Sequence, residues 1–278
     1  MKFALSTNWC CRHLEAGEAI VDAAAELGFD ALELGFHTTR EQVAGFKARL
    51  DMMPVGSVHA FCPVPISAPQ GYPELYQLAS LDEAARAIAR VHVRRNIEFA
   101  ADMGATAVVL HAGRVACSGF LRRWDMKRRV RRGKRLADVF RRELDALLPD
   151  LEKHGVVLGL ENLPYLEGFP AEWEVAGLCG EWVKPWFDTG HDRVRAGNQW
   201  KSPPGVPQGD APQPVGLHIN DSTGGDDHLP PGEGDIDFAA LAPIAAGARH
   251  LVFEPNESVS PKRLSAGLAK IKSLWESA

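Results

Sequence analysis

Short apolar segments recur along the chain, and each is followed by a loop and then by a stretch with helical spacing of its apolar positions. These segments are continuously apolar rather than alternating, which indicates a parallel sheet covered by helices. The eight predicted strands are Lys2–Ser6, Ala31–Phe36, Val55–Ala60, Ala107–His111, Val156–Glu161, Val183–Asp188, Val215–Ile219 and His250–Glu254. The clearest predicted helices are Glu15–Leu27, Leu81–Met103, Lys134–His154 and Pro261–Ser277.

This alternation of strand and helix predicts a single (β/α)8 barrel over residues 1–278. Leu27-Gly28, Met103-Gly104 and His154-Gly155 are typical helix ends, and each precedes a predicted strand. Neither a linker nor a change of composition marks a second domain. Three long βα loops interrupt the alternation, and we expect them at the catalytic end of the barrel: Phe61–Ala79, Ala112–Arg135 and Asp192–Gln213.

The ends of six predicted strands carry side chains that can bind a metal ion. They are His59, His111, Glu161, Asp188, His218 and Glu254. A charge at the end of an apolar strand is costly unless it is paired or binds a cation, so this ring predicts a divalent metal at the carboxyl ends of the strands. Three further candidates lie in loops: His191, Asp226 and His228. Nitrogen and carboxylate ligands without thiolate rank Mn and Zn first, with Co, Fe and Mg also compatible.

Each of these residues also has an ordinary structural interpretation. A single histidine at a strand end is more often a hydrogen-bonded structural residue, which applies above all to His59 and His111. Glu161 and Glu254 could form salt bridges, and Asp188 and Asp226 could cap a turn. The joint pattern is harder to explain in this way than any one residue.

Five motifs resemble the xylose isomerase-like barrels, a superfamily of sugar isomerases and epimerases that also holds the endonuclease IV class of DNA-repair enzymes. The motifs are LEN at Glu161, FDTGH from Phe187 to His191, HIND at His218, HLPPGEGDID from His228 to Asp237, and FEPN at Glu254. The resemblance runs over almost the whole chain. It implies a metal-dependent enzyme of carbohydrate metabolism whose partner is a small-molecule substrate.

The two branches of the superfamily imply different chemistries. The ketose epimerase branch implies one metal on Glu161, Asp188, His218 and Glu254, with His191 beside the substrate. Glu161 and Glu254 would then be the catalytic pair, moving a proton on and off carbon through a metal-stabilised enediolate of a sugar, sugar acid, polyol or sugar phosphate. The endonuclease IV branch implies two further zinc ions, on His59 and His111 and on His191, Asp226 and His228, and hydrolysis of a phosphodiester as at an abasic site in DNA.

The charge of the chain bears on this choice. Thirty-one Lys and Arg against 36 Asp and Glu give a net charge of −5, which provides no global attraction to nucleic acid. The cationic segment 122–135 could hold phosphate, although such segments usually form a solvated surface. Trp9 and Arg114 are weaker candidates for substrate contacts, with loop packing and a surface salt bridge as their alternatives.

The five cysteines lack paired metal-site spacing, and no apolar segment reaches the length of a membrane span. We therefore expect a cytoplasmic protein without a membrane span. The sequence leaves open the substrate, the number of metals and whether the protein is a homo-oligomer.

Overall fold

The computed structural model describes residues 1–115, 122–165, 167–197 and 212–276. Eight parallel strands close into a barrel in the order β1-β10-β9-β8-β6-β4-β3-β2. Their bounds are β1 Ala4–Ser6, β2 Ala31–Leu34, β3 Val55–His59, β4 Ala107–Leu110, β6 Val157–Glu161, β8 Val183–Asp188, β9 Gly216–Ile219 and β10 His250–Phe253. Each lies within a predicted strand, so the predicted (β/α)8 barrel is confirmed.

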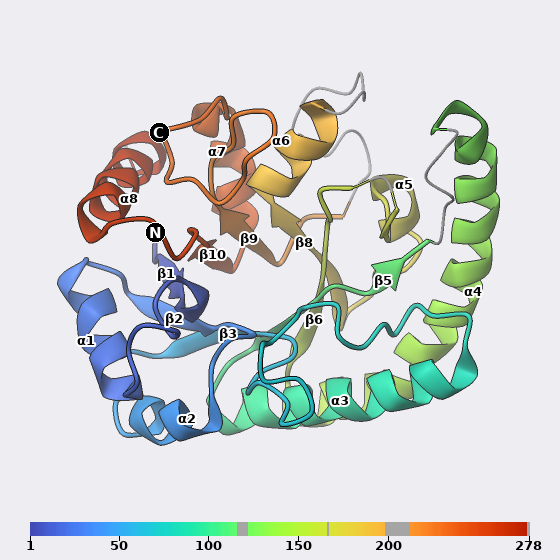
Figure 1. Cartoon of the computed structure of the whole chain (residues 1–278), viewed down its shortest axis with the longest axis horizontal. Coiled ribbons are helices and arrows are strands. Elements are labelled where there is room, and N and C mark those ends of the chain that lie inside the picture. The colour runs from blue at the N-terminus through green and yellow to red at the C-terminus, as the bar shows by residue number, and fades with distance from the viewer. Residues whose placement is uncertain (116–121, 166, 198–211, 277–278) are drawn as a thin grey trace.

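Helices lie outside the strands, and neighbours along the chain contact one another in the pairs α1 with α2, α3 with α4 and α7 with α8 (Figure 1). The helices are α1 Gly17–Glu26, α2 Arg40–Lys47, α3 Glu83–Asp102, α4 Arg122–His154, α5 Glu172–Val175, α6 Thr189–Gly197, α7 Phe238–Gly247 and α8 Pro261–Trp275. A 3-10 turn, η1, spans Thr7–Trp9, and a small antiparallel pair joins β5 Gly113–Arg114 to β7 Gly168–Phe169. Among the described residues, no helix is both long and apolar enough to cross a membrane.

Local signals explain several helix boundaries. The side chain of Asp82 caps α3 by accepting hydrogen bonds from the backbone N–H groups of Ala84 and Ala85 at 2.9 and 3.4 Å. Gly28 and Gly155, which follow α1 and α4, have φ angles of 84° and 64°. This left-handed conformation suits glycine because it has no Cβ, which confirms the predicted helix ends.

Two predicted loops are partly helical. Helix α4 begins at Arg122 rather than at the predicted Lys134. Arginine and lysine are good helix formers, so the cationic segment extends the helix instead of remaining a loop. Similarly, α6 occupies the start of the segment 192–213, which was predicted to be irregular.

Two apolar clusters hold the barrel together. The larger fills the space between strands and helices, and the smaller occupies the barrel interior with Ala4, Ala107, Val109, Trp186 and Val252. Trp186 is the largest of the interior side chains and is 1% exposed. It stacks on the ring of His250 with centroids 5.7 Å apart. The bulky indole therefore packs in the barrel interior, next to the carboxyl-terminal end that carries the predicted ligands.

Gly216 and Gly159 make room for this indole. A Cβ added at Gly216 would lie 2.4 Å from Cζ3 of Trp186, and one at Gly159 would lie 2.8 Å from Cε3. We expect Gly216→Ala to lower the free energy of unfolding by about 1–3 kcal/mol through overpacking, measured by chemical denaturation. Gly180→Ala is the matched control, because nothing lies within 4 Å of its added Cβ. If both substitutions had the same small effect, the close packing of Trp186 would not constrain position 216.

Candidate metal centre

The six predicted strand-end residues converge at the carboxyl end of the barrel. His59, Glu161 and Asp188 are the last residues of β3, β6 and β8, His218 lies within β9, and His111 and Glu254 directly follow β4 and β10. All six are buried. Parallel strands bring their carboxyl ends to one rim, so residues far apart in the sequence become neighbours.

Four of these residues form a compact group suited to one cation. Single ligand atoms of Glu161, Asp188, His218 and Glu254 all lie within 4.8 Å of one another. Nδ1 of His218 lies 3.2 Å from Oε1 of Glu161, 3.1 Å from Oε2 of Glu254 and 3.7 Å from Oδ2 of Asp188. Three carboxylates and one imidazole nitrogen form a donor set that both Mn²⁺ and Zn²⁺ accept, so these four residues fit a divalent metal.

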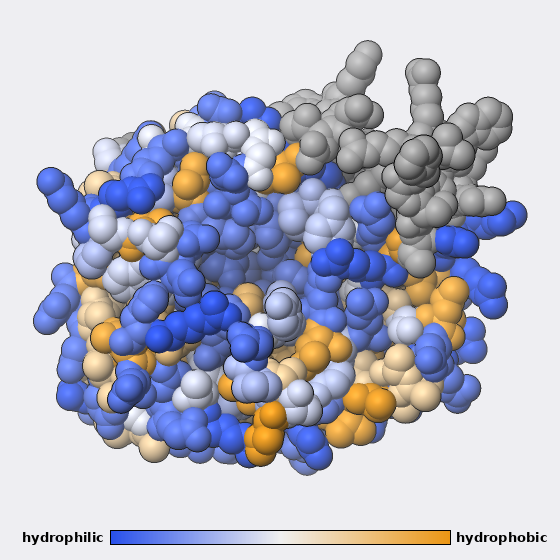
Figure 2. Space-filling model, in the orientation of Figure 1, coloured by the Kyte–Doolittle hydropathy of each residue, from blue (hydrophilic) through white to orange (hydrophobic). Residues whose placement is uncertain are grey.

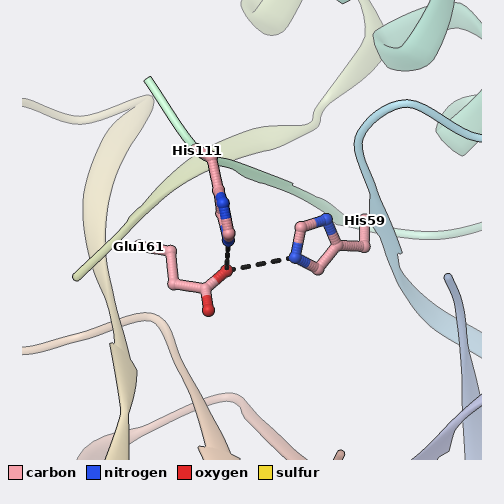
Figure 3. Close-up of side chains that lie close together, drawn as sticks. All are labelled: His59, His111 and Glu161. Atoms are coloured by element: carbon pink, nitrogen blue, oxygen red, sulfur yellow. Dashed lines mark hydrogen bonds and ion pairs between the residues drawn. The ribbon is translucent and has the colours of Figure 1, made fainter. Parts of the chain in front are cut away.

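A second group shares Glu161 with the first. Nε2 of His59 and Nε2 of His111 lie 3.1 and 3.0 Å from the same oxygen, Oε2 of Glu161. Figure 3 shows the two rings approaching that oxygen from different strands. Oε1 of Glu161 faces His218 instead. The Glu161 carboxylate therefore bridges two sets of potential ligands.

The third group differs from the prediction in one residue. The structure groups His191 and His228 with Asp227, whose carboxylate oxygens lie 3.8 Å from Nε2 of His191 and 4.0 Å from Nε2 of His228. Asp226 is exposed and belongs to none of the groups. Adjacent residues of a loop point in different directions, and the order of the letters in GGDDH does not reveal which of the two faces inward.

The orientation of the histidine rings supports the metal-binding interpretation. Three of them donate from Nδ1 to a backbone carbonyl: His59 to Ala60 at 3.0 Å, His191 to Asn162 at 2.9 Å, and His228 to Glu254 at 2.8 Å. A neutral ring that donates at Nδ1 has its lone pair at Nε2. That atom faces Glu161 in His59 and Asp227 in His191 and His228, although Nδ1 of His191 also lies 3.3 Å from Oε1 of Glu161. Such fixed rings are typical of metal-binding histidines.

Burial and charge oppose one another at these groups. Burial by itself raises the pKa of Glu161, but the neighbouring His111 and His218 hold that pKa well below its ordinary value. Burial lowers the pKa of His218, yet the carboxylates of Glu254, Glu33 and Glu161 raise it well above its ordinary range. The site thus keeps its carboxylates ionised by surrounding them with positive charge, which a divalent cation would also provide.

Asparagine side chains fix the carboxylates, a role that the sequence analysis did not assign. Asn220 donates from Nδ2 to Oδ2 of Asp188 at 2.9 Å, and Asn8 donates from Nδ2 to Oε1 of Glu254 at 3.2 Å. Asn162 pairs with the backbone of Asp188 through both its amide oxygen and its amide nitrogen. The signal was present, since Asn162 and Asn220 lie within the LEN and HIND motifs.

Asp221, the last residue of HIND, organises the loop that carries Asp227 and His228. Its buried carboxylate accepts backbone N–H bonds from Ser222, Gly232 and Ile236 at 2.9, 2.8 and 3.1 Å. The GEGD segment, residues 232–235, accordingly forms turns and bends. A single carboxylate therefore ties both ends of the loop to β9.

A sequence model of the xylose isomerase-like TIM barrel family matches residues 21–272, which is most of the chain. The chain belongs to this family. No curated protein matches its sequence significantly.

Solved structures resemble this xylose isomerase-like barrel over their full length. A D-tagatose 3-epimerase-like protein superposes with a TM-score of 0.72 at 20% identity, covering 99% of this chain and 97% of that one. The 3-keto-D-glucoside 4-epimerase of E. coli has a TM-score of 0.69 at 17% identity, with coverages of 98% and 99%. The IOLI protein with a zinc atom has a TM-score of 0.68 at 13% identity, with coverages of 100% and 99%. At these identities the likeness shows the shared fold.

The two weaker substrate-contact candidates of this xylose isomerase-like barrel have local structural partners. Trp9 is 7% exposed and donates from Nε1 to the carbonyl of Val259 at 2.8 Å, as its loop-packing alternative predicts. Arg114 forms an ion pair with Glu74 and lies 4.0 Å above the ring of Tyr165. Glu74 in turn lies 3.7 Å from Nδ1 of His111, so Arg114 is linked to the rim of the candidate metal centre.

The cationic segment lies along α4, where the described side chains of Arg131, Arg132, Lys134 and Arg135 are exposed. The side chains of residues 122–129 lie outside the described part of the structure.

Four cysteines are described and are free thiols: Cys10, Cys11, Cys62 and Cys179. Burial raises the pKa of both Cys10 and Cys11 to about 12, so these two thiols are poor nucleophiles. Cys117 lies outside the described residues.

Proposed function

We propose that this barrel is a divalent-metal-dependent isomerase or epimerase of a small sugar, sugar acid, polyol or sugar phosphate. The observation that carries the proposal is the placement of two buried glutamates, Glu161 and Glu254, whose carboxylate oxygens lie 3.2 and 3.1 Å from Nδ1 of His218. Two structural relatives, a D-tagatose 3-epimerase-like protein and a 3-keto-D-glucoside 4-epimerase, support the same reaction class.

Glu161, Asp188, His218 and Glu254 would hold the metal, as their donor set fits one. When bound, the metal supplies Lewis-acid polarisation of a substrate oxygen, which makes a neighbouring carbon-bound proton more acidic. We rank Mn and Zn first, and the zinc in the IOLI structure is consistent with that order.

Glu161 and Glu254 would exchange the proton. One ionised carboxylate removes a proton from carbon and the other, once protonated, returns a proton to the opposite face. Each is held in place by its neighbours: Glu161 by His59 and His111, and Glu254 by the amide of Asn8. Nearby histidines, opposed by burial, hold the pKa of both carboxyls low, which keeps the one that removes the proton from carbon ionised. The other takes up a proton from solvent before it returns one to the substrate.

A metal-dependent phosphodiesterase of the endonuclease IV type is the second candidate. The second and third groups of potential ligands favour it. In the second, His59 and His111 lie close to Glu161, and in the third, His191 and His228 lie close to Asp227. Several metals at short separations would suit attack on a phosphodiester and neutralisation of its charge. The net charge of −5 gives DNA binding no general support.

Metal content and two assays discriminate between these candidates. The leading proposal predicts about one metal per chain and uptake of solvent deuterium into at least one member of a panel of ketoses. The second candidate predicts about three zinc ions per chain and nicking of DNA that contains an abasic site. Three zincs with nicking and without deuterium uptake would replace the leading proposal by the second one.

A further inference from the structure

Glu33 is a buried carboxylate that the predicted ligand ring did not include. It belongs to β2 and is 0% exposed inside the barrel. His218 donates from Nε2 to Oε1 of Glu33 at 3.1 Å, and Ser57 donates from Oγ to Oε2 at 2.8 Å. A buried charge is costly without such partners, and these two hydrogen bonds offset that cost. The position of Glu33 directly behind His218 suggests a role at the metal centre.

The ring of His218 is held from two sides by other rings. His59 stacks parallel to it, with centroids 5.6 Å apart and an interplanar angle of 9°, and Trp186 meets it at 5.2 Å and 66°. These contacts fix the plane of the imidazole. They do not distinguish its nitrogen edge from its carbon edge, because a half-turn of the ring about its bond to Cβ preserves the plane.

The carboxylate of Glu33 makes that distinction. It only accepts hydrogen bonds when ionised, so it requires a proton at Nε2 of His218. Nδ1, which faces Glu161 and Glu254, is then the nitrogen that gives up its proton when a metal binds. A half-turn of the ring would remove Nε2 from Glu33 and Nδ1 from both glutamates together.

We propose that Glu33 is the positioning residue of the metal centre. It selects the orientation and tautomer in which His218 presents Nδ1 to the metal, and it adds a negative charge behind that ligand. The inference rests on the proposed metal site and is independent of which substrate the enzyme converts.

Two substitutions separate the hydrogen bond from the charge. Glu33→Gln keeps an acceptor oxygen and removes the charge, whereas Glu33→Leu removes both. Zinc affinity is measured by competition with a chromophoric chelator on the full-length protein. We expect Glu33→Leu to weaken Zn²⁺ binding by about 10–100-fold and Glu33→Gln to weaken it less. Glu41→Gln, which changes an exposed carboxylate on α2, is the matched control and should leave the affinity unchanged.

A nitrogen-15 NMR measurement of His218 in the zinc-loaded protein gives a second readout. The native chain should show a protonated Nε2 and an unprotonated Nδ1, and Glu33→Leu should lose this fixed tautomer. A residue that only stabilised the fold would lower the midpoint of thermal unfolding without changing either the zinc affinity of the folded protein or the tautomer. Unchanged affinity and tautomer in Glu33→Leu would overturn the inference, whereas a native chain that binds no Zn²⁺ would overturn the metal site itself.

Discussion

Glu254→Gln is expected to slow deuterium exchange into a responsive substrate by about 10²–10⁴-fold, the usual contribution of a general acid or base. Glutamine has nearly the shape of glutamate, and its amide can still pair with neighbouring groups. It cannot accept a proton from carbon at neutral pH, so one half of the exchange is lost. The rate constant kcat for exchange, measured by NMR or mass spectrometry, reports this step.

Glu257→Gln is the matched control for this prediction. Glu257 lies three residues further along the same loop, is exposed, and pairs with Arg12 at 3.7 Å. Its substitution should leave kcat nearly unchanged. If Glu254→Gln retained full activity on an identified substrate, the assignment of Glu161 and Glu254 as the acid and base pair would be wrong.

Removal of the metal with a chelator is expected to abolish activity and to lower stability. Glu161, Asp188 and Glu254 are buried within a few ångströms of one another, and a bound cation offsets their mutual repulsion. A ligand present at about 100 times its dissociation constant stabilises the native state by about 2.7 kcal/mol. For a chain of this size, its loss should lower the midpoint of thermal unfolding by roughly 5 °C.

Reconstitution and one variant complete the test. Addition of Mn²⁺ or Zn²⁺ should restore both activity and the unfolding midpoint. Asp188→Asn, which weakens the same site, should make the midpoint much less sensitive to chelation. An unfolding midpoint that chelation leaves unchanged, in a protein that had contained stoichiometric metal, would contradict a stabilising role for the cation.

The strands and the polar residues at their carboxyl ends could be predicted because each depends on local sequence. Continuously apolar segments such as Val156–Glu161 form buried parallel strands, and the polar side chain at the end of each marks the rim. The closed barrel and the family match confirm the predicted fold. A charged residue inside a strand indicates a site residue less clearly than one at the end of a strand. Glu33 in ALEL was therefore missed, although its burial makes it part of the same network.

The start of α4 and the choice between Asp226 and Asp227 could not be read from the local pattern. The segment Ala112–Arg135 was expected to be a loop, yet the intrinsic helix preference of its arginines and lysines prevailed. The direction of a loop side chain depends on what anchors the loop. Here the buried carboxylate of Asp221 and the hydrogen bond from the backbone N–H of His228 to Asn220 set that direction.

The sequence by itself determined the alternation of strands and helices and the residues available as ligands, because hydrophobic periodicity and side-chain chemistry are local properties. Only the tertiary structure decided which ligands share an oxygen, as His59 and His111 do at Glu161, and which nitrogen of His218 faces them. These features depend on distances between strands and on the packing of Trp186 and Glu33, which closure of the barrel creates.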